Sequence, residues 1–161
     1  MTRRLVLAVP LAALATSAVL LVPGAGAAAT HTQTLRFFDK PASIKLTHAD
    51  GTVETRSPLP EPRAGDTLDV NSLDYTGDHT SHTKRFTGST HLRCVFGAGG
   101  PPKCESHVAI GSSLLVFTGD PATVSDGTGI YQGATGRVVS SKDVAGQDDA
   151  SDVVVKVRLA G

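Results

Sequence analysis

Short runs in which apolar and polar residues alternate, separated by clusters of Gly, Pro, Asp and Asn, repeat along most of the chain. In the segment 152–161 (DVVVKVRLAG) every second residue from Val153 to Leu159 is apolar, while Lys156 and Arg158 fall on the opposite face. A period of two is typical of a strand with one buried face, and no long segment shows the period of a helix. The pattern predicts an all-β chain, arranged as an antiparallel barrel or sandwich.

Five further segments carry a strand pattern, with turn or loop residues between them, and they are 34–38, 43–47, 66–75, 86–96 and 104–117. The last segment, taken as one strand, is apolar on both faces, with Val108 and Leu114 on one and Leu115 on the other. This predicts a strand that is buried on both sides or lies in a small barrel with a filled or apolar interior. Three prolines in 56–65 exclude a central strand there, so we expect a connection.

The segment 124–140 (VSDGTGIYQGATGRVVS) carries four glycines within ten residues. A phosphate-binding loop needs its glycines directly before a helix, but β-branched residues follow here and the G-x-G-x-x-G spacing is missed by one residue. Glycines inside strands instead mark sharp bends and close backbone approach. We therefore expect a hairpin in which Gly127 to Gly129 turn the chain, while Gly133 and Gly136 let the strands coil.

The first 29 residues have the pattern of a secretory signal peptide. Arg3 and Arg4 precede an apolar run, and small residues follow it, with cleavage expected after Ala27 or Ala29. No positive stop-transfer group follows the run, which makes a membrane anchor the weaker interpretation. Residues 30–161 are then expected to form a single β-barrel domain of a secreted, extracellular protein, and export by the general or the twin-arginine route stays open.

The charge balance of the mature part narrows the choice of partners. Two of the 15 basic residues lie in the signal peptide, which leaves 13 basic against 15 acidic side chains. Nucleic-acid binders usually carry a basic face, so no nucleic-acid partner is expected. No second apolar run of membrane length occurs, so no membrane association is expected after cleavage.

The chain has two cysteines, Cys94 and Cys104, separated by a loop rich in Gly and Pro. Two nearby thiols in an oxidising compartment usually pair. A disulfide that closes about ten residues stabilises a fold by roughly 2–3 kcal/mol. A metal site built from these thiolates and histidines is the alternative, but no C-x-x-C pair supports it. We predict the disulfide and no metal.

Histidines with acid–base potential are scattered along the chain. His79 and His82 lie in an expected loop, and His91 and His107 flank the two cysteines. A metal or acid–base cluster is one interpretation, and solvated side chains or side chains bonded within hairpins are the other. No G-x-S-x-G or H-E-x-x-H motif occurs, so a serine hydrolase or a zinc protease is not supported.

The glycine-rich segment resembles the T-G-G-[ST]-G-x-[FY]-x-G-[AV]-x-G segment of the allene oxide cyclase and dirigent superfamily, with Asp126 in place of a glycine. Other pieces follow the order of that family: GDTLDVNSLDY, THLRCVF, CESHVAIGSSLLVF and VVVKVRL. Together the resemblance covers roughly 35–159, and it is closest to the allene-oxide-cyclase-like barrel proteins that bacteria secrete. It implies an eight-stranded antiparallel β-barrel with an apolar central cavity, assembled as a homodimer or homotrimer.

The resemblance also implies cofactor-free control of a small, reactive, apolar molecule. An apolar pocket that confines a flexible chain near its reacting shape lowers the entropic barrier. In the family's Y-E-x-N pattern Asp39 stands at the glutamate and is the candidate catalytic residue, although Pro41 replaces the asparagine. A second cavity asparagine of the family falls near Ser72, with Asn71 adjacent, and both are candidate ligand-binding residues.

Tyr75 and Tyr131 are further candidate ligand-binding residues, because their phenol groups suit a cavity, and packing with the hydroxyl at the rim is the alternative. The cysteine that lines the cavity of the plant cyclases aligns with Cys94, which we expect in a disulfide, so allene oxide cyclisation itself is not expected. Two functions stay open. One is a secreted barrel that binds a small apolar molecule and isomerises, cyclises or stereochemically steers it. The other is a non-catalytic binding or structural barrel with a filled core.

Overall fold

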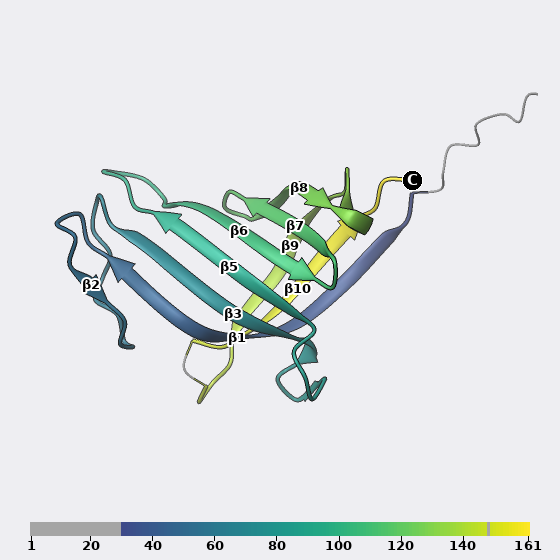
Figure 1. Ribbon diagram of the computed structural model, residues 1–161, viewed down its shortest axis with the longest axis horizontal. Coiled ribbons are helices and arrows are strands. Elements are labelled where there is room, and N and C mark those ends of the chain that lie inside the picture. The colour runs from purple at the N-terminus through teal and green to yellow at the C-terminus, as the bar shows by residue number, and fades with distance from the viewer. Residues whose placement is uncertain (1–29, 148) are drawn as a thin grey trace, which may run out of the picture.

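The computed structural model describes residues 30–147 and 149–161 (Figure 1). The predicted signal peptide, residues 1–29, lies outside the described residues. The elements are β1 (Thr32–Thr47), β2 (Val53–Glu54), β3 (Thr67–Asp78), β4 (Ser81–His82), β5 (Gly88–Val95), β6 (Lys103–Ile110), β7 (Ser113–Thr118), β8 (Thr123–Thr128), η1 (Gly129–Tyr131), β9 (Thr135–Asp143) and β10 (Ser151–Arg158).

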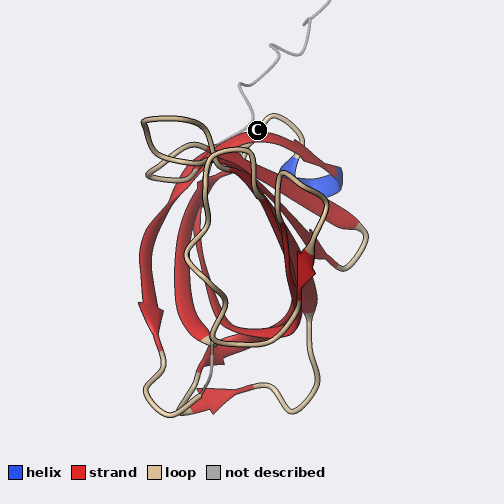
Figure 2. Cartoon of the chain, turned by 90° about the vertical axis from the view of Figure 1, so that its left-hand side faces the viewer, coloured by secondary structure: helices blue, strands red, loops and turns tan. Residues whose placement is uncertain are grey.

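The strands close on themselves. Their order is β2-β1-β10-β9-β8-β7-β6-β5-β3-β4, and an additional pairing of β1 with β3 joins the two sides of the sheet. β2 and β4 are two-residue strands beside β1 and β3, and the other eight form an antiparallel barrel around a central space (Figure 2). The predicted eight-stranded antiparallel barrel is confirmed.

β1 is long enough to serve both sides of the barrel. Its first half pairs with β10 and its second half with β3, and the register with β3 shifts between Pro41 and Ser43. Pro41 has no N–H to give to a ladder, which favours a bulge at this point. The two predicted strands 34–38 and 43–47 are therefore one strand with a bulge. Asp39, before the bulge, faces the barrel interior.

The prediction that 104–117 is one strand is wrong. The segment forms β6 and β7, joined by a tight turn in which Gly111 has a φ of +59°, a conformation that glycine adopts without steric cost. The turn reverses the chain, so Val108 lies opposite Leu115 and both side chains are buried at the interior. Leu114, expected on the face of Val108, lies on the other face because successive residues of a strand alternate.

The glycine-rich segment forms the predicted hairpin between β8 and β9, but its turn starts later than expected: Gly127 lies in β8, and η1 begins at Gly129. Gly127 leaves no room for a side chain, since a Cβ atom there would lie 2.4 Å from the backbone oxygen of Tyr131. Gly136 of β9 approaches β10 as closely, with a Cβ position 2.3 Å from the backbone oxygen of Lys156. Gly133, expected in a strand, lies in the connection with a φ of +68°. Close backbone approach is thus found at two glycines that lie in strands, Gly127 of β8 and Gly136 of β9.

Cys94 and Cys104 form the predicted disulfide and occupy facing positions in the ladder of β5 and β6.

The main hydrophobic core includes Tyr131 of η1, which packs with residues such as Val157 and Leu159 near the C-terminus. Over the described part of the chain, no helix has the length and apolar character needed to span a membrane.

Candidate functional site

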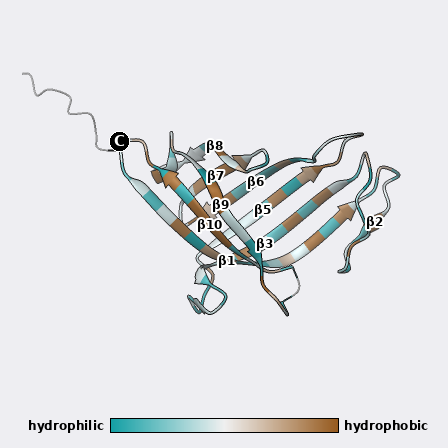
Figure 3. Cartoon of the chain, turned by 180° about the vertical axis from the view of Figure 1, so that it is seen from behind, coloured by the Kyte–Doolittle hydropathy of each residue, from teal (hydrophilic) through white to brown (hydrophobic). Residues whose placement is uncertain are grey.

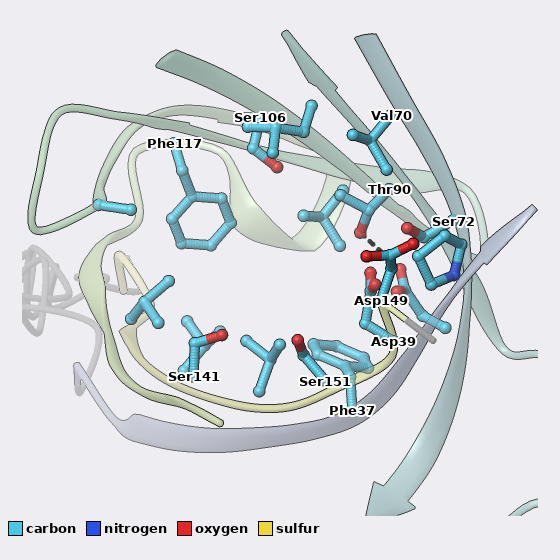
Figure 4. Close-up of a pocket in the computed structure, with 18 of the residues that line it drawn as sticks. Phe37, Asp39, Val70, Ser72, Thr90, Ser106, Phe117, Ser141, Asp149 and Ser151 are labelled. Atoms are coloured by element: carbon cyan, nitrogen blue, oxygen red, sulfur yellow. Dashed lines mark hydrogen bonds between the residues drawn. The ribbon is translucent and has the colours of Figure 1, made fainter. Parts of the chain in front are cut away.

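The barrel encloses a cavity of about 640 Å³ (Figure 4). This volume falls within the range of about 300–1,000 Å³ that small-molecule sites usually have. Much of its wall is apolar, because alternate residues of each strand point into the barrel. The main apolar side chains are Phe37, Val70, Val108, Leu115, Phe117 and Val155.

The cavity extends to the end of the barrel at which three connections meet. Leu59, Ala122 and Asp149 line it and belong to the β1–β3, β7–β8 and β9–β10 connections. These connections share one end because consecutive barrel strands are antiparallel. Asp149 and the neighbouring Asp143 are exposed, which places the opening there. Tyr131, in the β8–β9 connection at the opposite end, is only 1% exposed.

Two carboxyl groups face one another inside this cavity. Asp39 of β1 and Asp74 of β3 are register partners, and both line the cavity. Asp74 is 1% exposed, and Thr90 Oγ1 donates a hydrogen bond to its Oδ2 at 2.8 Å. Ser72, two residues earlier on β3, donates to Asp39. Figure 4 shows Asp39, Ser72 and Thr90 together on one side of the cavity, with Phe117 on the other.

Burial holds these carboxyl groups toward their protonated form. Burial is the main cause that raises the pKa of Asp74 from 3.8 to about 7; the hydrogen bond from Thr90 opposes the rise, and the adjacent Asp39 adds to it. Burial also raises the pKa of Asp39, against hydrogen bonds from Asp74 and Ser72 that lower it. Two carboxyl groups this close share a proton more readily than both ionise. The pair therefore favours a singly protonated form, in which one carboxyl group can donate a proton and the other can accept one.

The described residues that line the cavity include no Lys, Arg or His that would neutralise this pair. Asp143 and Asp149 add two more carboxylates towards the opening, and Ser151 Oγ donates to Asp143 Oδ1 at 3.3 Å. All polar side chains of the lining are thus carboxyl or hydroxyl groups. Such a lining disfavours an anionic ligand, because no side chain would compensate the added negative charge.

The structure places two of the predicted site residues, Asp39 and Ser72, at the cavity. Asn71 and Tyr75 lie on the outer face of β3, since successive residues of a strand point to opposite sides. Asn71 is exposed, and Tyr75 packs against His82 with ring centroids 5.2 Å apart. We therefore do not carry Asn71 and Tyr75 into the candidate site.

Tyr131 also lies apart from the cavity lining. Its side chain packs in the core with Val157, and burial raises the pKa of its phenol. Among the histidines, His79 pairs with Asp152, and none of the six lines the cavity in the part of the chain described. Across residues 30–147 and 149–161, no group of three or more His, Cys, Asp or Glu side chains has the arrangement of a metal site.

Asp74 and Thr90 are site residues that the sequence analysis did not single out. The alternation of inward and outward residues along β3 could have identified Asp74. Once Ser72 is assigned to the interior, Val70 and Asp74 must share its face. A carboxyl group on an otherwise apolar inner face is a candidate for a shifted pKa and hence for chemistry.

Comparison with known proteins shows a likeness of fold. The chain is similar to a pyocyanin demethylase, with a TM-score of 0.53 and 16% identity over 79% of this chain and 99% of that one. It is also similar to a pterocarpan synthase dirigent protein, with a TM-score of 0.51 and 11% identity over 81% of this chain and 90% of that one. No protein-family profile and no curated protein matches the sequence. These likenesses support a dirigent-like barrel fold and carry no site residues.

Proposed function

We propose that this protein is secreted and binds a small, mostly apolar molecule in the barrel cavity, where Asp39 and Asp74 exchange protons with it. The reaction class is a cofactor-free isomerisation or cyclisation. The observation that carries this proposal is the carboxyl pair itself, two facing carboxyl groups in an apolar cavity whose described lining residues include no Lys, Arg or His. General acid–base catalysis is most efficient when the catalytic pKa lies near the working pH.

The pair can supply both halves of a proton-transfer isomerisation. The Asp39 carboxylate accepts a proton from one atom of the bound molecule, while protonated Asp74 donates a proton to another atom of it. The molecule keeps its formula, because one proton leaves and one arrives. Asp39 then returns its proton to Asp74 along the hydrogen bond between them, which restores the pair. The apolar wall limits competing water and holds the molecule near its reacting shape.

Binding without catalysis is the second candidate function. The cavity favours a ligand-binding barrel over a structural barrel with a filled core. Hydroxyl and carboxyl groups in an apolar wall also suit the recognition of a stable ligand. The two similar structures are called a pyocyanin demethylase and a pterocarpan synthase dirigent protein. One scaffold hosts many activities, so the fold does not choose between the two functions.

Native mass spectrometry of the protein purified from its own culture medium tests the binding proposal. We expect a copurified apolar molecule on the wild-type chain. Val70→Trp fills the cavity and should abolish the bound mass, whereas Asn71→Trp places the same side chain on the outer face and should retain it. A bare wild-type protein, with no thermal shift against a panel of neutral and cationic apolar molecules, would contradict ligand binding.

Deuterium incorporation separates catalysis from binding. The copurified molecule is released and incubated in heavy water with wild-type protein, Asp39→Asn or Asp74→Asn. Proton transfer through the pair should place deuterium on carbon in the wild-type sample, with a rate at least about 100-fold lower in either variant. Bound molecule that stays free of deuterium and unchanged in chromatographic retention would identify a non-catalytic binding barrel.

A further inference from the structure

We infer that the cavity selects an organic cation: a small, mostly apolar molecule that carries one positive charge, such as a protonated amine or a delocalised aromatic cation. The inference rests on the proposed ligand-binding function and names the ligand class of the same cavity. It follows from the negative charge of the interior, the outward position of the basic side chains and the apolar wall of the cavity.

The charged side chains that line the cavity are acidic. Asp39 and Asp74 line the cavity, and Asp143 and Asp149 line it nearer the opening. A carboxyl pair that shares one proton still carries one negative charge. Buried charges in proteins are normally paired with an opposite charge. No described side chain of the lining supplies one, so a cationic ligand would be the missing partner.

Basic and acidic residues of the same strands lie on opposite faces of the barrel wall. Lys40 follows Asp39 on β1, and Lys142 precedes Asp143 on β9. Both lysines are exposed and absent from the lining, because strand alternation turns them outward. The inner surface is therefore acidic, although the chain as a whole has equal numbers of acidic and basic residues.

The apolar wall of the cavity decides what kind of cation fits. Phe37 and Phe117 line the cavity, and the face of an aromatic ring attracts a positive charge. A hard metal ion needs a cage of six or more oxygen ligands, which the described residues do not form. A fatty acid or another organic anion would add negative charge beside Asp39. An apolar cation satisfies both the wall and the carboxylates.

A matched set of fluorescent probes tests the inference. Neutral N-phenylnaphthylamine, its sulfonate and its trimethylammonium derivative share one ring system and differ in charge. With wild-type protein the cation should bind at least about tenfold more tightly than the neutral probe, and the sulfonate should bind most weakly. The double variant Asp39→Asn, Asp74→Asn should remove the preference for the cation and retain the neutral probe. Asp69→Asn removes a carboxylate from the outer face of β3 and should leave the preference unchanged.

The outcomes distinguish a failure of the cation preference from a failure of ligand binding. Equal affinity of the wild-type protein for the cationic and neutral probes would overturn the inference while preserving ligand binding. A cation preference that persists in the double variant would also overturn it, because the carboxyl pair of Asp39 and Asp74 would then not select the charge of the ligand. Failure of every probe to bind would contradict the proposed function itself. The wild-type comparison is independent of the variants, and circular dichroism establishes that each variant is folded.

Discussion

Asp74→Asn is expected to stabilise the protein at neutral and alkaline pH and to leave it nearly unchanged in acid. The carboxyl of Asp74 has a pKa of about 7 in the folded protein against an ordinary value of 3.8, so the folded state binds this proton more tightly than the unfolded chain does. The resulting stability is complete below 3.8 and is lost as the pH rises through about 7. Each tenfold difference in proton affinity is worth about 1.4 kcal/mol. The loss therefore reaches about 4 kcal/mol once the pH exceeds the folded pKa.

Asparagine keeps the size of the side chain and a donor towards Asp39, but it cannot ionise. The free energy of unfolding of both proteins is measured by urea titration at several values between about pH 4 and pH 8. The difference between variant and wild type should grow with pH, with the titration belonging to the Asp39–Asp74 pair as a unit. Asp69→Asn, on the outer face of the same strand, is the control for loss of a carboxylate. A difference that does not change with pH would refute the reasoning, because Asp74 would then be ionised throughout.

Three further results are expected. Replacing Cys94 and Cys104 by Ser should lower the free energy of unfolding by roughly 2–3 kcal/mol, measured by denaturant titration, and a reductant should have no additional effect on that variant. Gly127→Ala should destabilise by about 1–3 kcal/mol, because its Cβ would lie 2.4 Å from the backbone oxygen of Tyr131. Gly97→Ala, which meets nothing within 4 Å, should leave the melting temperature within a degree or two. A Gly127→Ala variant as stable as the Gly97→Ala variant would show that the backbone there is free to shift. Phe117→Ala should enlarge the cavity and lower stability by about 3–5 kcal/mol in the same titration, and full retention of stability would contradict its place in the core.

The alternation of apolar and polar residues predicted the strands well where one face is buried and the other is exposed to solvent. The segment 152–161 shows this, since Val155 and Val157 are buried while Lys156 is exposed. The alternation failed in 104–117, which is apolar on both sides of a turn. There the sequence offers only Gly111 and the adjacent serines as a mark of chain reversal, and apolar residues continue on both faces after them. The register of β6 and β7 comes from barrel closure, which no local pattern encodes.

The site was predicted only in part. Successive residues of a strand point to opposite faces, and the sequence alone did not show which of two adjacent residues points into the cavity. The resemblance drew attention to Asp39, and Ser72 followed from it. Asn71 and Tyr75 were one residue out of phase with the inner face. Asp74 was in phase, but its significance depends on the pairing of β1 with β3, which brings the two carboxyl groups together across many residues of sequence. Burial of both then shifts their pKa values, and burial is a property of the closed barrel.

The number of paired residues between neighbouring strands varies around the barrel. Between β8 and β9 the ladder has a single pair, Thr123 opposite Arg137, whereas β5 and β6 share a long, regular ladder that includes the disulfide. One more backbone hydrogen bond, from the N–H of Val138 to the oxygen of Ala122 at 2.9 Å, continues this seam, and both residues line the cavity. Local opening needs the least free energy where the fewest backbone hydrogen bonds break. We expect amide hydrogen exchange to be fastest at this β8–β9 interface. A ligand would then enter the cavity between β8 and β9 while the other strands of the barrel stay paired.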